Sequence, residues 1–291
     1  MQTFRPCRSM LFMPASNARA LEKARDLPSD GVIFDLEDAV APDAKEAARE
    51  QAVAALKAGG YGRRLRVVRL NGLDTPWWRD DLALAVTGKP DAVLLPKVEQ
   101  VESLQRVEEE MAWLGGCDDV ALWSMIETPM AFLRLEALAT ATDRQTTWVI
   151  GTNDLVKDLR AEHTKDRLPV MMALSNALLV ARADGLTILD GVYGNFRDGE
   201  GFGAECRQAK SMGFDGKTLI HPSQIEGANS VFAPGEEDVA LARRMITVFD
   251  DAKAAGRGVA VLDGRMIEEL HVEVARQQVA MAAAIAQLSE G

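Results

Sequence analysis

Short apolar runs alternate with longer amphipathic stretches along most of the chain. The apolar runs have the length of buried strands, whereas the amphipathic stretches repeat their apolar positions with helical spacing. The expected strands are residues 9–13, 31–37, 64–70, 91–98, 120–127, 147–152, 186–192 and 216–221. The expected helices are residues 17–26, 44–58, 76–86, 101–114, 129–141, 169–183, 204–212 and 235–255.

Proline and glycine mark the ends of these helices. Pro76, Pro129 and Pro169 stand where three helices begin, and Gly59 and Gly115 stand where two helices end. Short connections between successive strand and helix units predict an α/β fold, a TIM (β/α)8 barrel. A doubly wound open sheet is the alternative.

No glycine-rich dinucleotide fingerprint follows the first strand. The segment Gly199-Glu-Gly-Phe-Gly203 lacks the GxGxxG spacing and follows Asp198 rather than an apolar strand, so we interpret it as a loop. The pattern changes after Gly256 to a short apolar run, an Asp-Gly turn and a helix-like stretch. We expect residues 1–256 to form the catalytic barrel. Residues 257–291 are expected to form a flap and helix that cover an active site, packing on a neighbouring subunit.

Composition and charge narrow the classes of function. The 291 residues carry a net charge of -11, which argues against nucleic acid or an anionic membrane surface as a partner. The chain lacks a long apolar run and a signal-peptide core, so a cytoplasmic enzyme is expected. The three cysteines are scattered without CxxC spacing and are expected to be buried free thiols. A basic cluster near the N-terminus, with Arg19 and Lys23, is either a solvated face or a docking place for an anionic ligand.

Carboxylates follow three of the expected strands at the point where each strand ends. Asp35, Glu37 and Asp38 stand at the end of the second strand, Glu127 closes the fifth, and Asp154 comes just after the sixth. Neighbouring strands lie about 4.8 Å apart, so Glu127 and Asp154 can reach one cation. Mg²⁺ suits such a site, because it takes one or two protein carboxylates and leaves positions for substrate oxygens. Either acid alone would more often be a loop or capping group.

Strand alternation places several polar side chains on defined faces. Arg69 shares a face with Val67, and Asp35 and Glu37 share a face with Ile33, whereas Asp38 points the other way. We assign Glu37 to the rim of the metal site through its water shell. Asp38 is expected to orient a neighbouring cation or, alternatively, to start a helix.

Seven motifs resemble, in order and spacing, the citrate lyase β-subunit-like proteins, which belong with the HpcH/HpaI aldolases and the malyl-CoA lyases. The resemblance covers the chain from Arg8 to about Arg276. The motifs are Arg8-Ser-Met-Leu-Phe-Met-Pro14, Asp35-Leu-Glu-Asp-Ala-Val40, Val68-Arg-Leu-Asn71, Leu95-Pro-Lys97, Ile126-Glu-Thr128, Gly151-Thr-Asn-Asp154 and Gly216-Lys-Thr-Leu-Ile-His-Pro222.

The resemblance implies a TIM barrel, Mg²⁺, and reversible carbon–carbon cleavage or condensation of acyl thioesters with 2-oxo acids. The expected reaction interconverts a 3-hydroxyacyl-CoA of the malyl-CoA, methylmalyl-CoA or citramalyl-CoA type with an acyl-CoA and a glyoxylate- or pyruvate-like 2-oxo acid. A malyl-CoA thioesterase is one alternative. A citrate lyase β subunit acting on citryl-acyl-carrier protein, or serving mainly to dock that carrier, is another. A homotrimer or homohexamer is expected.

The resemblance also implies roles for the oxo-acid site. Arg69 would clamp the oxo-acid carboxylate through both edges of its guanidinium, with Asp38 and Lys97 behind it. The loop of Gly151, Thr152 and Asn153 would bind the oxo acid. This loop departs from the version with Phe-Gly that is common among citrate lyase subunits, which leaves the size of the substrate open.

The thioester partner needs phosphate-binding cations and a base. The resemblance assigns coenzyme A to Arg19 and Lys23, and the base to Asp263 in the motif Leu262-Asp-Gly-Arg-Met266, which acts in trans on a neighbouring barrel. An Asp-Gly surface turn is the structural alternative for Asp263. His221 is interpreted as a packing residue at the end of the barrel.

Overall fold

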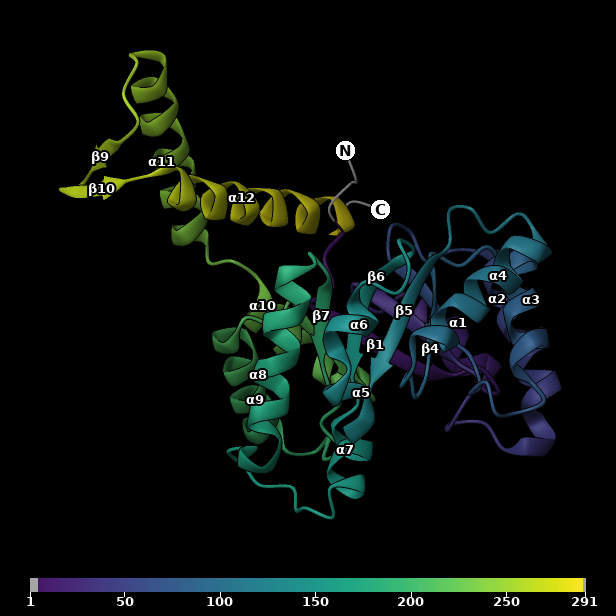
Figure 1. The fold of residues 1–291 in the computed structure, drawn as a ribbon. Helices are drawn as coiled ribbons and strands as arrows, with labels where there is room; N and C mark the ends of the chain where they lie inside the picture. The colour runs from purple at the N-terminus through teal and green to yellow at the C-terminus, as the bar shows by residue number, and fades with distance from the viewer. Residues whose placement is uncertain (1–4, 290–291) are drawn as a thin grey trace. The chain divides into compact units, whose positions relative to one another are not determined.

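A closed barrel of parallel strands forms the larger part of the protein (Figure 1). The computed structural model describes residues 5–289. Each strand pairs with the next in parallel, and β8 closes the barrel on β1. The predicted TIM barrel is therefore confirmed. The strands are β1 (Ser9–Pro14), β2 (Gly31–Asp35), β3 (Leu65–Arg69), β4 (Ala92–Leu95), β5 (Ala121–Ile126), β6 (Gln145–Ile150), β7 (Thr187–Asp190) and β8 (Gly216–Leu219).

Helices follow the strands and cover the outside of the barrel (Figure 1). Apolar side chains alternate along each strand, so Ile33 and Val67 fill the interior while Val32 and Val68 pack toward the helices. The helices are α1 (Ala18–Ala24), α2 (Lys45–Ala58), α3 (Trp78–Gly88), α4 (Val101–Leu114), α5 (Pro129–Leu133), α6 (Leu135–Ala139), α7 (Thr152–Asp158), α8 (Leu168–Ala183), α9 (Gly199–Met212) and α10 (Ile225–Phe232), with 3-10 turns η1 (Pro42–Ala44) and η2 (Pro222–Gln224).

Three elements differ from the prediction. Helix α7 begins directly after β6, and α10, which packs against β1 and β8, takes the place expected for the helix at 235–255. The interpretation of Gly199–Gly203 as a loop was wrong, because α9 begins at Gly199. Asp198 caps this helix by accepting a hydrogen bond of 2.9 Å from the backbone amide of Gly201.

Residues 233–289 belong, with Arg5 and Pro6, to a second compact unit, so the division falls earlier than the expected boundary after Gly256. Helix α11 (Glu236–Ala254) packs against α12 (Glu269–Ser289) instead of serving as a barrel helix. The hairpin of β9 (Ala260–Leu262) and β10 (Arg265–Ile267) adds to the apolar cluster of this unit. The packing of the segment on a neighbouring subunit stays a prediction.

Two expectations from composition can be compared with the structure. Cys7, Cys117 and Cys206 are free and buried, as expected. Among residues 5–289, none of the helices combines the length and the apolarity that crossing a bilayer requires.

Candidate active site

A cavity of about 350 Å³ opens among the carboxyl ends of the barrel strands. In TIM barrels this end carries the active site, because the loops that leave the strands converge there. The predicted residues Arg69, Glu127 and Asp154 all line this cavity. The remaining wall is formed by Phe12, Pro14, Asp35, Asp38, Ala39, Met125, Gly151, Thr152, Asn153, Val192 and Ile220.

Glu127 is the buried carboxylate of this cavity, with an exposed fraction of 2%. Its Oε1 accepts a hydrogen bond of 2.8 Å from the backbone amide of Lys97, which holds a left-handed conformation with φ of 51°. No ion pair involves Glu127 among the described residues. Burial, together with the nearby carboxylates of Glu37 and Asp154, raises the pKa of Glu127 to about 7. A buried carboxylate with a raised pKa lacks enough neighbouring positive charge to stabilise its ionised form.

Gly151 makes the position of Glu127 possible. A Cβ atom on Gly151 would lie 2.3 Å from Cβ and 2.5 Å from Oε2 of Glu127. Any other residue would therefore displace the carboxylate. The role of Gly151 in this structure is to leave room for Glu127, a contact that the sequence did not reveal.

Asp154 supplies a second carboxylate from the first turn of α7. Its side chain is 27% exposed, and its Oδ1 accepts a hydrogen bond of 3.0 Å from Nζ of the solvent-exposed Lys157. Within residues 5–289 no group of three or more His, Cys, Asp or Glu side chains is arranged to hold a metal ion. Two carboxylates are nevertheless sufficient for Mg²⁺, which keeps several waters. The buried, unpaired Glu127 beside Asp154 therefore fits a divalent cation.

Arg69 is held by Asp35 across neighbouring strands. The parallel register places Asp35 directly beside Arg69, and Asp35 accepts hydrogen bonds of 2.7 Å from Nε and 2.6 Å from Nη2. Burial opposes the charge of the guanidinium, but Asp35 and Glu37 outweigh burial and raise the pKa of Arg69 above its ordinary value. Because Asp35 occupies the two-pronged edge, the predicted bidentate clamp on a substrate carboxylate is not free. Nη1 is the remaining edge, and Glu37 already pairs with it.

Glu37 pairs with two cations behind the cavity. Its Oε2 lies 2.6 Å from Nη1 of Arg69, and its Oε1 lies 3.4 Å from Nζ of Lys97. Burial raises the pKa of Glu37, and the positive charges of Arg69 and Lys97 oppose that rise. Glu37 does not belong to the cavity wall. Its predicted place in the water shell of a metal stays a prediction.

Asp38 differs from its expected orientation. It lines the cavity with a side chain that is 65% exposed, and its Oδ2 lies 3.7 Å from Nη1 of Arg69. The expectation that Asp38 points away from Glu37 was wrong, since β2 ends at Asp35 and strand alternation no longer applies beyond it. Asp35, rather than Asp38, is the main partner of Arg69.

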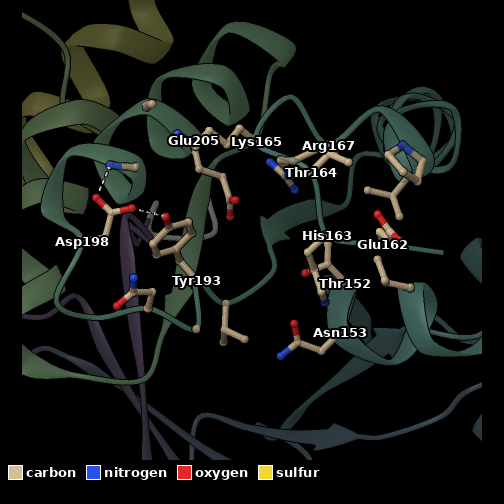
Figure 2. Close-up of a pocket in the computed structure, with 18 of the residues that line it drawn as sticks. Thr152, Asn153, Glu162, His163, Thr164, Lys165, Arg167, Tyr193, Asp198 and Glu205 are labelled. Atoms are coloured by element: carbon tan, nitrogen blue, oxygen red, sulfur yellow. Dashed lines mark hydrogen bonds between the residues drawn. The ribbon is translucent and has the colours of Figure 1, made fainter.

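A larger cavity of about 620 Å³ adjoins the first (Figure 2). Thr152, Asn153 and Val192 line both cavities, so the predicted oxo-acid loop forms part of the wall between them. Figure 2 shows Tyr193 and Asp198 on one side and His163 with the loop on the other. The Tyr193 hydroxyl donates a hydrogen bond of 2.7 Å to Asp198.

Buried ion pairs fix the wall of the larger cavity. Arg167 pairs with Asp190, and Nζ of Lys217 lies 2.6 Å from Glu205 and 2.7 Å from Asp190. Asp190 and Glu205 therefore have cationic partners at this wall, whereas Glu127 in the smaller cavity has none among the described residues. We assign the chemistry to the smaller cavity for this reason.

Several predicted residues lie outside both cavities. Arg19 and Lys23 are exposed on α1, on the same face of the helix. Asp263 forms a turn with φ of 49° in the second unit, where it accepts hydrogen bonds of 2.8 and 3.0 Å from Arg244. His221 stacks on Phe196 with ring centroids 4.5 Å apart, as expected of a packing residue. The roles of Arg19, Lys23 and Asp263 stay predictions.

Comparison with known proteins places this geometry in a family. The sequence profile described as HpcH/HpaI aldolase/citrate lyase matches residues 8–222. The chain is 49% identical over 281 residues to a protein of Cereibacter sphaeroides named (3S)-malyl-CoA thioesterase, covering 97% of this chain and 96% of that one. It is 34% identical over 274 residues to the citrate lyase subunit beta of Escherichia coli, covering 92% and 91%.

Solved structures agree with these matches. The protein CitE of Mycobacterium tuberculosis, in complex with magnesium, acetoacetate and coenzyme A, superposes with a TM-score of 0.74 and 28% sequence identity. The superposition covers 94% of this chain and 97% of that one. The citrate lyase beta subunit of the same organism, with oxaloacetate and magnesium, gives a TM-score of 0.69 at 28% identity, covering 80% of this chain and 100% of that one.

Proposed function

The chain belongs to the HpcH/HpaI aldolase/citrate lyase family, and we propose that it is a Mg²⁺-dependent hydrolase of a 3-hydroxyacyl-CoA of the malyl-CoA type. The observation that carries the proposal is the buried Glu127, which lines the cavity with Asp154 and has no cationic partner within residues 5–289. The similarity to a malyl-CoA thioesterase over nearly the whole chain favours hydrolysis over cleavage of a carbon–carbon bond.

Glu127 and Asp154 would hold the metal ion. Gly151 keeps the space that the Glu127 carboxylate needs, and the amide of Lys97 fixes one of its oxygens. When bound, Mg²⁺ would supply positive charge and polarise oxygen atoms of the substrate. The raised pKa of Glu127 is consistent with this role, because a cation would favour the ionised form that burial disfavours.

Arg69 would bind the carboxylate of the hydroxyacyl group through Nη1, which the substrate would share with Glu37, since Asp35 holds the other edge. Arg19 and Lys23, exposed on α1, would meet the phosphates of coenzyme A. In the hydrolytic step a water oxygen bonds to the thioester carbon, the carbon–sulfur bond breaks, and the thiolate takes up a proton. The products are the free hydroxy acid and coenzyme A.

The second candidate function is the acyl-CoA lyase, and the motif around Asp263 favours it. In that reaction a base takes a proton from the methyl carbon of an acyl-CoA, and the resulting enolate attacks the carbonyl carbon of a 2-oxo acid. Asp263 would be the base, reaching the barrel of a neighbouring subunit in a trimer or hexamer. The hairpin that carries it has strands of three residues each, and the turn with Asp263 at its tip is exposed.

The test is incubation of the purified protein and Mg²⁺ with a panel of hydroxyacyl-CoA thioesters, following free coenzyme A and 2-oxo acid separately. We expect free coenzyme A and intact hydroxy acid. A 2-oxo acid together with an acyl-CoA would instead establish the lyase. Absence of turnover, with tight binding of an acyl-carrier protein, would identify a carrier-docking subunit and refute both enzymatic proposals.

A further inference from the structure

Lys45 is a buried lysine behind the acidic side of the cavity. It is the first residue of α2, and its exposed fraction is 6%. Its ammonium donates hydrogen bonds of 2.7 Å to the carbonyl oxygen of Leu36 and 2.7 Å to that of Glu37. The same ammonium lies 5.4 Å from the ring centroid of Trp77. All of these contacts lie within the barrel unit.

Two general effects disfavour a lysine at this place. Burial removes the hydration of the ammonium, and it lowers the pKa of Lys45 despite the carboxylates of Asp35 and Glu37 nearby. The N-terminus of a helix also carries partial positive charge, which repels a cation. A residue that meets both penalties must be compensated by its contacts, and both hydrogen bonds of the Lys45 ammonium go to a single segment of the chain.

That segment, residues 36–39, links the end of β2 to the cavity and is held from two sides. Asp35 accepts hydrogen bonds from the backbone amides of Glu37, at 2.9 Å, and Ala39, at 3.3 Å. Lys45 binds the carbonyl groups on the other side. Asp35 and Glu37 are also the two residues that hold the guanidinium of Arg69.

We propose that Lys45 is a positioning residue, which fixes segment 36–39 and thereby sets the placement of Arg69 at the cavity. The link to substrate rests on the proposed function, because Arg69 is assigned there to the substrate carboxylate. The effect on the segment itself does not depend on that assignment.

The experiment compares Lys45→Met with Lys45→Arg, which keeps the charge and the donors. Lys57→Met is the matched control, since Lys57 is exposed in the last turn of the same helix. Hydrogen exchange of the ligand-free full chain measures the backbone amides of Glu37 and Ala39, which Asp35 binds. Steady-state kinetics with malyl-CoA measures KM and kcat separately.

In Lys45→Met we expect these amides to exchange at least about tenfold faster, with the amides of β5 and β6 unchanged. We expect KM to rise about tenfold and kcat to change less than about threefold, because the binding of the carboxylate is displaced rather than the hydrolytic step. Lys45→Arg should lie between Lys45→Met and the wild type, and Lys57→Met should match the wild type.

Exchange of the segment within about twofold of wild type in Lys45→Met would overturn the proposal, as would a uniform acceleration throughout the barrel. If Lys45→Met does not fold, Lys45→Gln gives the same test with an uncharged donor. If the wild type does not turn over malyl-CoA, the proposed function fails, and the exchange measurement still decides the role of Lys45.

Discussion

Replacing Glu127 by Gln should make the metal-free protein less sensitive to pH and abolish its response to Mg²⁺. The glutamine keeps the size of the side chain and an oxygen for the amide of Lys97, so the packing against Gly151 is preserved. What the substitution removes is the negative charge. The effect of this loss on the free energy of unfolding depends on the raised pKa of the buried carboxyl group.

The pKa of Glu127 rises from 4.5 to about 7 in the folded protein. Between these values the folded protein binds a proton that the unfolded chain has released, so the stability of the metal-free protein falls as the pH rises through this window. The shift corresponds to about 3 kcal/mol once the carboxylate is fully ionised. Glutamine does not ionise, so Glu127→Gln lacks this part of the pH dependence.

The assay is the unfolding free energy of wild type and variant at pH 5 and at pH 8, with a chelator present. An unsatisfied amide group costs about 1–3 kcal/mol at either pH, and taking the difference between the two pH values removes this cost. We expect the stability of the variant to rise by about 2.5 kcal/mol relative to that of the wild type between pH 5 and pH 8, because the unfolded carboxyl is already partly ionised at pH 5. Glu50→Gln, an exposed substitution on α2, is the control and should gain nothing.

Addition of Mg²⁺ at pH 8 should then stabilise the wild type and leave Glu127→Gln unchanged, because a ligand stabilises only the form that binds it. A gain below about 0.5 kcal/mol between the two pH values would show that Glu127 is not the group whose burial opposes ionisation. Equal stabilisation of both proteins by Mg²⁺ would show that the cation binds elsewhere.

The other predictions follow from the same geometry. Arg69→Lys keeps the charge but loses the two-pronged contact with Asp35, so kcat/KM should fall by about 2–4 kcal/mol in transition-state stabilisation, and a loss under about threefold would contradict the role. Gly151→Ala should weaken Mg²⁺ binding at least about tenfold in calorimetry, because its Cβ meets Glu127, whereas Gly199→Ala, which meets nothing within 4 Å, should not. If the lyase is the correct function, inactive Asp263→Asn and Glu127→Gln subunits should restore activity when reassembled together, and confirmed mixed oligomers without activity would exclude action in trans.

The barrel was predictable because its strands are apolar on both faces and proline and glycine separate them from the helices. Helix α7 was not, since it is only 7 residues long and only Gly151 separates it from the end of β6. Helix α9 was not predicted to begin at Gly199, because glycine is unfavourable inside helices and the first five residues of this helix include three glycines. Gly201 is required there, because a Cβ would lie 2.2 Å from the Tyr193 hydroxyl, which binds the capping Asp198.

The site was predictable as a set of residues, but only in part as a set of contacts. Arg69, Glu127 and Asp154 were recognised because each follows an apolar run. The pairing of Asp35 with Arg69 depends on the register between β2 and β3, which a one-residue slip would abolish. The hydrogen bond from the Lys97 amide to Glu127 depends on the left-handed backbone of Lys97, which a lysine in the sequence does not predict.

The most direct test of the proposed function follows the fate of oxygen in a single turnover of malyl-CoA in ¹⁸O-labelled water with Mg²⁺. Hydrolysis at the cavity predicts malate that carries one ¹⁸O atom in the carboxylate formed from the thioester, without glyoxylate at any time point. Glu127→Gln should give neither product above the uncatalysed rate. Glyoxylate and acetyl-CoA appearing before labelled malate would contradict hydrolysis and assign the site to carbon–carbon cleavage.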